Sequence, residues 1–320
     1  MRDPVVDVCK GFAILFVYLG HSILYHPISL WDIPWCNYIG MVIFSFNMPL
    51  FFIVSGYLFA QSRKTLRQAF VDKFRRLAIP YFFTAAIVCI IKVFAVPQGA
   101  SYHQLGGVDL VLSWFISGGE RWFVYVLFWI FIVMLTVRPI INYKIAILLM
   151  VFSVICKEME IFQEYQIIEK IMFYTFHFLL GYIFYEHFKE KILVHKRICY
   201  FFLFLVPIDF ICVYFIQEGL IFDYILSIIG SLEVIVASKL ICISRFKSLT
   251  DFLGYIGRNS LQFYLFAFGY PIIRVVMVSF FKITDPLVLV PSIFILQIIS
   301  TILIVEFLRR IRILRIPCGF

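Results

Sequence analysis

Long apolar runs, separated by short polar breaks, fill most of the chain. The runs continue for about 15 to 20 residues without the period-two alternation of barrel strands, which is typical of membrane-spanning helices. They cover residues 8–27, 37–60, 77–96, 121–141, 142–160, 168–187, 198–217, 223–243, 260–281 and 286–308. The pattern predicts an all-α membrane protein with about ten transmembrane helices.

Basic residues indicate which side of the membrane each polar break faces. In a ten-span topology, 21 of the 28 Lys and Arg fall in cytoplasmic segments. There are two at the N-terminus, six in 61–76, two in 138–144, four in 189–197, three in 245–258 and four in 309–315. Because cytoplasmic segments of membrane proteins are enriched in Lys and Arg, both termini are predicted to be cytoplasmic.

Composition supports this class of protein. Hydrophobic residues make up 63% of the 320 residues and charged residues 15%, which a soluble domain of this length could not bury. The net charge of +9 follows from the topology, so a nucleic-acid partner has no support. The eight cysteines are scattered without a CxxC pair, so neither a disulfide framework nor a metal site is predicted. We treat residues 1–320 as a single polytopic domain.

One apolar segment near the N-terminus carries ionisable groups, although such groups are costly in hydrocarbon. The segment DVCKGFAILFVYLGH (7–21) contains Asp7, Lys10 and His21. On an α-helix, Lys10 and His21 point within about 20° of each other, and Asp7 points within about 40° of His21. His21 lies about 16 Å along the axis from Lys10, near the bilayer centre. The stripe predicts a buried imidazole reached from the cytosol; the alternative is two interfacial charges and a packing histidine.

This segment resembles the first-helix signature of the acyltransferase-3 family, whose members are integral-membrane O-acyltransferases that modify sugars of surface polysaccharides and related glycans. The family pattern of a basic residue, ten residues and a histidine is matched by Lys10 and His21. Further resemblances follow in order along nearly the whole chain: SFNMPLFFIVSGYLF (45–59), DKFRRLAIPYFF (72–83), RWFVYVLF (121–128), FHFLLGYIF (176–184) and YIGRNSLQFYLF (255–266). The resemblance implies an enzyme of the bacterial cytoplasmic (inner) membrane.

Two positions depart from the pattern of many relatives. A histidine just before Met-Pro is replaced by Asn47, and a histidine shortly after the SLxxYL helix start is replaced within Phe266, Ala267 and Phe268. The first-helix histidine is retained, so the resemblance still predicts an enzyme.

The resemblance implies acyl transfer from acyl-CoA, with acetyl-CoA as the expected donor and no metal. A neutral imidazole with an unperturbed pKa of about 6.5 is a suitable general base, so His21 is expected to take the proton of a sugar hydroxyl. An acyl-histidine intermediate is the variant mechanism. Asp7 is expected to position Lys10, and Asn47 is a candidate for orienting substrate. Transfer of succinyl or another acyl group stays open.

Five further residues are predicted to bind the two substrates. Arg donors suit phosphate oxygens, so Arg75 and Arg76 are expected to hold the phosphates of CoA together with Lys10. For the acceptor, the candidates are Ser55, Arg121 and Trp122. Their simpler interpretations are helix packing at Ser55 and an aromatic-belt anchor at Trp122.

The expected partners are a glycan or lipid-linked sugar as acceptor, acyl-CoA and the lipid bilayer, with a homo-oligomer left open. A multi-pass transporter of a glycan, lipid-linked sugar or small anion is the alternative function, since charges within spans fit that class too. The second alternative is an inactive relative of the family. Further intramembrane polar residues have no assigned partner: His177, Asp209, Glu233, Lys239 and Arg274.

Overall fold

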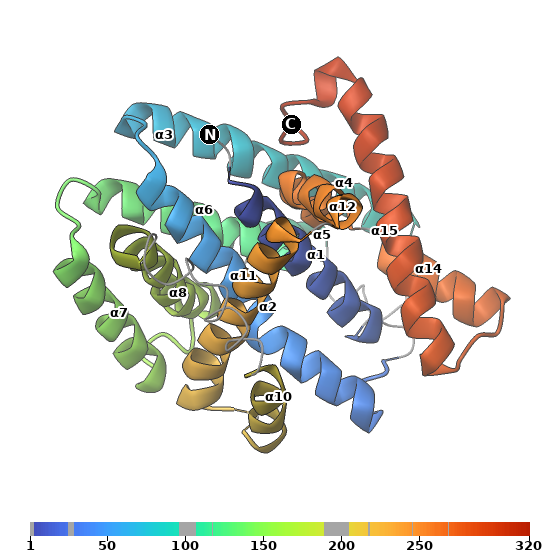
Figure 1. Ribbon diagram of the computed structural model, residues 1–320. Coiled ribbons are helices and arrows are strands. Elements are labelled where there is room, and N and C mark those ends of the chain that lie inside the picture. The colour runs from blue at the N-terminus through green and yellow to red at the C-terminus, as the bar shows by residue number, and fades with distance from the viewer. Residues whose placement is uncertain are drawn as a thin grey trace. The chain divides into compact units, whose positions relative to one another are not determined.

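The computed structural model describes residues 3–24, 29–95, 107–116, 118–188, 205–216, 218–244, 246–267 and 269–320. Within these ranges all regular structure is helical and no strand occurs, which confirms the predicted all-α class (Figure 1). The predicted basic cluster at 189–197, the first part of the predicted span 198–217 and most of the outer loop before residue 107 lie outside the described residues.

Six helical stretches are long and apolar enough to cross a membrane, which identifies a multi-pass integral membrane protein. They are Pro4–Leu24, Pro34–Gln61, Val111–Val137, Gln166–Tyr185, Phe222–Ile243 and Pro286–Arg310. Each coincides with one of the ten predicted spans. The other four predicted spans are helical where described, but their helices are shorter or interrupted. The number of ten membrane crossings therefore stays a prediction.

The chain divides into two compact units, and each is described by itself. Unit 1 comprises Met1–Ala60 and Gly181–Val305, and unit 2 comprises Gln61–Leu180 and Glu306–Phe320. Two helices, α8 (Gln166–Phe188) and α15 (Pro286–Arg310), continue from one unit into the other. This division leaves the single domain 1–320 as a prediction.

In unit 1, helix α1 (Pro4–Leu24) packs against α11 (Ser227–Ile243) and α12 (Lys247–Arg258) (Figure 1). Glycines make the contact with α12 unusually close. A Cβ atom added at Gly257 would lie 1.7 Å from the carbonyl oxygen of Asp7, and one at Gly11 would lie 2.2 Å from that of Leu253. Since no side chain fits there, the backbones of α1 and α12 touch.

The remaining helices of unit 1 include two with notable local features. In α2 (Pro34–Gln61), Pro49 lies inside the helix, and Gly181 of α8 approaches the carbonyl oxygen of Ile53. The predicted span 260–281 is divided into three pieces, because α13 ends at Leu265 and a new helix begins at Gly269. The other elements are α10 (Val206–Phe215), η4 (Ile221–Leu226), α13 (Ser260–Leu265), α14 (Gly269–Val275) and η5 (Val276–Phe280).

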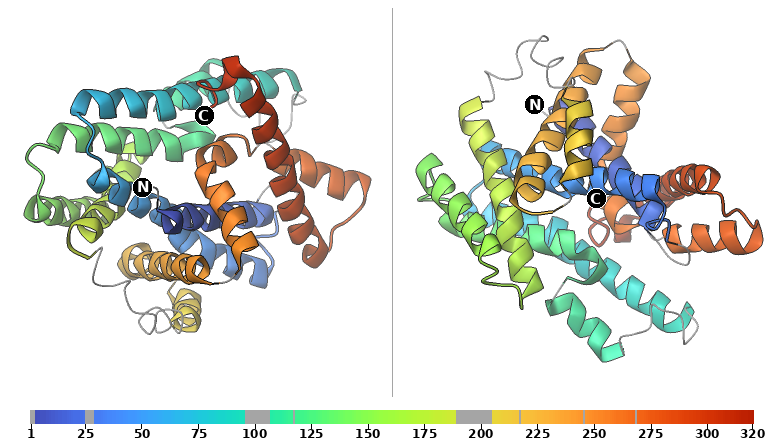
Figure 2. Two further views of the ribbon diagram at one scale, coloured as in Figure 1. Left: turned by 45° about the horizontal axis from the view of Figure 1, so that its top comes forward. Right: turned by 90° about the horizontal axis from the view of Figure 1, so that it is seen from below.

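Unit 2 begins with α3 (Leu66–Lys73), which is held at its start by a capping box between Thr65 and Gln68. Helix α6 (Trp122–Val137) packs against α3 and the π-helical turn η1 (Phe74–Ala78) (Figure 2). The Lys73 ammonium lies 3.6 Å from the ring centroid of Phe131. The other elements are α4 (Ile79–Ala95), α5 (Gly107–Ile116), η3 (Gly119–Arg121), α7 (Tyr143–Glu158) and η6 (Arg312–Leu314).

Candidate active site

Asp7, Lys10 and His21 lie on one continuous helix, α1, as the sequence predicts. The Lys10 ammonium is 3.4 Å from Asp7 Oδ1, and the Asp7 side chain is only 6% exposed, against 19% for Lys10. An ion pair one helical turn apart is favourable, and its burial here reduces screening by water and salt. The buried carboxylate of Asp7, in unit 1, therefore restricts the direction in which the Lys10 side chain points.

His21 is half-buried three residues before α1 ends. Two aromatic side chains contact its imidazole: Phe44 of α2, with ring centroids 6.2 Å apart, and Tyr270 of α14, with ring centroids 5.6 Å apart and planes at 68°. Gly20, just before His21, leaves room for the Phe44 ring, because a Cβ there would lie 2.8 Å from it. The imidazole is thus enclosed by rings from two other helices.

Two predicted site residues, Asn47 and Ser55, lie on α2 and differ in burial. Asn47 is 1% exposed, and its Oδ1 accepts a hydrogen bond of 2.6 Å from the backbone N–H of Met48, which precedes Pro49 in the same continuous helix. Ser55 is half-buried. Both belong to unit 1, as His21 does. The amide oxygen of Asn47 is thus engaged by its own helix, and a role toward substrate stays a prediction.

Arg75 and Arg76 lie in η1 of unit 2, and both are exposed. Arg76 Nε is 3.0 Å from Asp72 Oδ1, and the ammonium of Lys64 is 3.0 Å from the other oxygen of the same carboxylate. One acid therefore holds two of the basic side chains in place. The cluster is exposed to solvent, and binding of CoA phosphates there stays a prediction.

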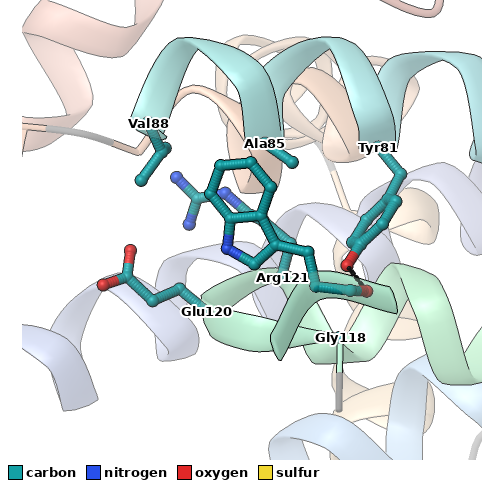
Figure 3. Close-up of a pocket in the computed structure, with 7 residues that line it drawn as sticks. Tyr81, Ala85, Val88, Gly118, Glu120 and Arg121 are labelled. Carbon is teal, nitrogen blue, oxygen red and sulfur yellow. Dashed lines mark hydrogen bonds between the residues drawn. The ribbon is translucent and has the colours of Figure 1, made fainter. Parts of the chain in front are cut away.

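Arg121 lines a small pocket of unit 2 (Figure 3). Tyr81 and Ala85 of α4 form one side, Glu120 and Arg121 another, and the Tyr81 hydroxyl donates a hydrogen bond of 2.7 Å to the carbonyl oxygen of Trp114. The cavity volume of about 10 Å³ holds about one water molecule. A sugar ring does not fit inside this pocket, so an acceptor could only reach Arg121 from its rim.

Trp122, beside it, already contacts two side chains of α8. Its ring stacks on Tyr174 of α8 with centroids 5.4 Å apart, and the ammonium of Lys170 is 5.0 Å from its centroid. The preceding turn depends on Gly118 and Gly119, whose φ values of 76° and 51° bring the chain from α5 into α6. The structure thus shows Trp122 packed against α8.

The candidates fall into two groups by unit. Unit 1 contains Asp7, Lys10, His21, Asn47 and Ser55, and unit 2 contains Arg75, Arg76, Arg121 and Trp122. The buried His177 donates a hydrogen bond from Nδ1 to the carbonyl oxygen of Phe173, 3.2 Å away in its own helix.

Sequence reasoning missed Tyr270 and assigned no partner to Arg274, although both contact α1 close to His21. More than 240 residues separate them from α1 in sequence, and no local pattern pairs positions so far apart. The signal available in the sequence was the cost of an arginine inside an apolar run, which predicts some partner without naming it.

Comparison with known proteins identifies the family of the chain. The acyltransferase-3 family model, described as an acyltransferase domain, matches residues 3–306. The chain belongs to the acyltransferase-3 family. It is therefore a membrane acyltransferase, which requires an acyl donor and an acceptor.

Two curated proteins share shorter stretches with this acyltransferase. The nodulation protein NolL of Mesorhizobium japonicum is 31% identical over 93 residues, 28% of this chain and 25% of that protein. The nodulation protein NolL of Sinorhizobium fredii is 30% identical over 128 residues, 39% of this chain and 33% of that protein. The matched stretches span no more than a third of either relative. No solved structure matches the chain.

Proposed function

We propose that the protein is an O-acyltransferase that moves an acyl group, acetyl in the first instance, from acyl-CoA to a sugar hydroxyl of a surface polysaccharide or lipid-linked glycan. The observation that carries the proposal is the match to the acyltransferase family over residues 3–306, which includes the helix that holds Asp7, Lys10 and His21. We assign the protein to the bacterial cytoplasmic membrane.

His21 is proposed as the general base. Its imidazole takes the hydroxyl proton as the sugar oxygen attacks the thioester carbonyl. The carbon–sulfur bond then breaks, and the imidazolium returns the proton to the leaving thiolate, so that CoA departs as the thiol. The aromatic rings of Phe44 and Tyr270 support this role, since they restrict the directions in which the imidazole can turn.

The phosphates of CoA are proposed to bind Lys10, Arg75 and Arg76. Support comes from the chemistry of each group: a guanidinium pairs with phosphate oxygens through two parallel hydrogen bonds, and an ammonium acts as a point charge. The exposure of Arg75 and Arg76 suits a water-soluble donor arriving from the cytosol. Asp7 keeps Lys10 directed, and Asn47, Ser55, Arg121 and Trp122 remain the candidates for the acceptor.

The test uses the full chain in lipid vesicles with acetyl-labelled acetyl-CoA and a total extract of bacterial glycans and glycolipids. We expect an alkali-labile acetyl ester on a sugar, detected by mass spectrometry, and its loss in His21→Ala. Uptake of an unmodified glycan without any labelled product would instead favour the transporter. Vesicles that give neither product nor uptake, with the protein folded, would favour an inactive relative.

A further inference from the structure

The short helix α14 (Gly269–Val275) contacts the end of α1 that carries His21. It presents two residues one turn apart, Tyr270 and Arg274, and both side chains are almost completely buried, at 2% and 0% exposure. Helix α14 continues directly into η5 (Val276–Phe280), and these two buried side chains attach its first turns to α1.

Arg274 binds the last turn of α1 directly. Its Nη2 group donates a hydrogen bond to the carbonyl oxygen of Ser22, the residue after His21. Because α1 ends at Leu24, this oxygen is among the last four carbonyls, which have no partner within the helix. A cation also interacts favourably with the negative end of the helix dipole. Arg274 thus acts as a C-terminal cap in the turn that holds His21.

Tyr270 contacts the imidazole itself and the helix turn below it. Its ring lies edge-on to His21, with centroids 5.6 Å apart, and edge-on to Tyr18, with centroids 5.4 Å apart. Edge-to-face pairs of this kind are favourable beyond the burial of area, because the positive edge of one ring meets the negative face of the other. Tyr270 therefore restricts the rotation of His21 from one side, while Phe44 restricts it from another.

A hydrogen-bond chain anchors the same turn to the rest of unit 1. The Tyr18 hydroxyl donates to the carbonyl oxygen of Phe263 at 2.8 Å and lies 3.1 Å from Thr301 Oγ1. Gln297 Nε2 donates to that Thr301 oxygen at 2.9 Å. The chain carries no charge and ends at Tyr18, one turn before His21. The elements α13, α14 and α15 thereby converge on one turn of α1.

We propose that Tyr270 and Arg274 are positioning residues for His21: Arg274 fixes the helix turn and Tyr270 fixes the imidazole within it. This inference rests on the proposed role of His21 as the base. It explains why a guanidinium is completely buried here, since removing such a charge from water costs several kcal/mol unless it is hydrogen-bonded. General-base catalysis depends on this placement, because the nitrogen must be within hydrogen-bond reach of the hydroxyl.

The test compares matched variants of the full chain in vesicles, with kcat and KM for acetyl-CoA measured separately. Tyr270→Phe keeps the ring and is expected to stay within about twofold of wild type, whereas Tyr270→Leu is expected to lower kcat about tenfold. Arg274→Met is expected to lower kcat at least tenfold, with partial recovery in Arg274→Lys. KM for acetyl-CoA is expected to stay within about twofold throughout, because neither residue is among those proposed to bind the donor. A loss confined to KM would overturn the inference.

A second experiment distinguishes a positioning role of Tyr270 from a general effect on the stability of the fold. In a His21→Gln background, Tyr270→Leu is expected to cause no further loss of residual activity, because residues that act through one group are non-additive. A further tenfold loss in that background would indicate a merely structural role and overturn the inference. Should Arg274→Met fail to fold, the Tyr270 pair carries the same test. Wild-type activity in Tyr270→Leu with an inactive His21→Gln would overturn the inference alone, whereas full activity in His21→Gln would overturn the proposed function.

Discussion

His21 in unit 1 and the Arg75–Arg76 pair in unit 2 have opposite surroundings. His21 is enclosed by Phe44 and Tyr270, and the helix turn that carries it is hydrogen-bonded to Arg274. The two arginines are exposed, and Arg76 pairs with Asp72 one turn away in the same segment. These surroundings match two different requirements of the proposed acyl transfer. A base needs a fixed direction, whereas a site for a soluble anionic donor needs access and charge.

The close contact between α1 and α12 should be the feature of unit 1 most sensitive to mutation. In Gly257→Ala the new Cβ would meet the Asp7 carbonyl oxygen at 1.7 Å, so the backbones must separate. We expect a loss of about 1–3 kcal/mol or more in stability, with loss of activity. Thermal unfolding in detergent and acyl transfer in vesicles measure both.

Gly254→Ala on the same helix is the matched control for that variant. Its Cβ would meet only the flexible end of Arg258, at 3.0 Å, so we expect a change within about 0.5 kcal/mol. Equal effects of the two substitutions would contradict the close backbone contact.

The exposed arginines should affect binding of the donor and leave the chemical step alone. Exposed charges contribute up to about 1 kcal/mol each, so the double variant Arg75→Gln, Arg76→Gln is expected to raise KM for acetyl-CoA about five- to tenfold with kcat unchanged. The difference should shrink at high salt, because exposed charges are screened. The control Arg63→Gln, Arg67→Gln removes two exposed arginines of the same basic segment and should leave KM within twofold. A fall in kcat in the first variant would contradict the assignment.

Trp122 distinguishes an acceptor site from a packing contact. Loss of its stacking with Tyr174 and of the Lys170 contact in Trp122→Ala is expected to cost about 1–2 kcal/mol of stability, whereas Trp122→Phe keeps most of it. If Trp122 also stacks on the sugar, the alanine variant should raise KM for the acceptor about threefold. An unchanged acceptor KM would mean that Trp122 is only an anchor.

The smallest expected effect concerns Cys318 near the C-terminus. Burial raises the pKa of its thiol from 9.0 to about 11. The folded protein thus holds this proton more tightly than the unfolded chain. The contribution of the thiol to the free energy of unfolding is therefore complete below pH 9 and is lost as the pH rises toward 11. Alkylation at pH 8, followed by mass spectrometry, should be slow at Cys318 and fast once the protein is unfolded in detergent. Rapid alkylation of the folded protein would contradict its burial.

The sequence predicted well what depends on neighbouring positions. Apolar runs predicted the helices, and helical spacing placed Asp7 next to Lys10, which the structure shows as an ion pair. It could not predict Tyr270 and Arg274 as neighbours of His21, because that contact joins α14 to α1. Nor could it predict the interruption before Gly269, since the run is apolar on both sides. There a Cβ would lie 2.5 Å from Gln297 Oε1 of α15, a constraint visible only in the fold.

His21 is predicted to act in the chemical step and not in the binding of acetyl-CoA. The most direct test measures acetyl-CoA affinity by equilibrium dialysis and kcat by product formation in His21→Gln. His177→Gln is the matched control, since His177 is another buried histidine and its Nδ1 bonds to the carbonyl oxygen of Phe173 in its own helix. We predict that Kd stays within about twofold in both variants, and that kcat falls at least 100-fold in His21→Gln alone. A kcat in His21→Gln within tenfold of wild type, or an equal loss in His177→Gln, would contradict the account.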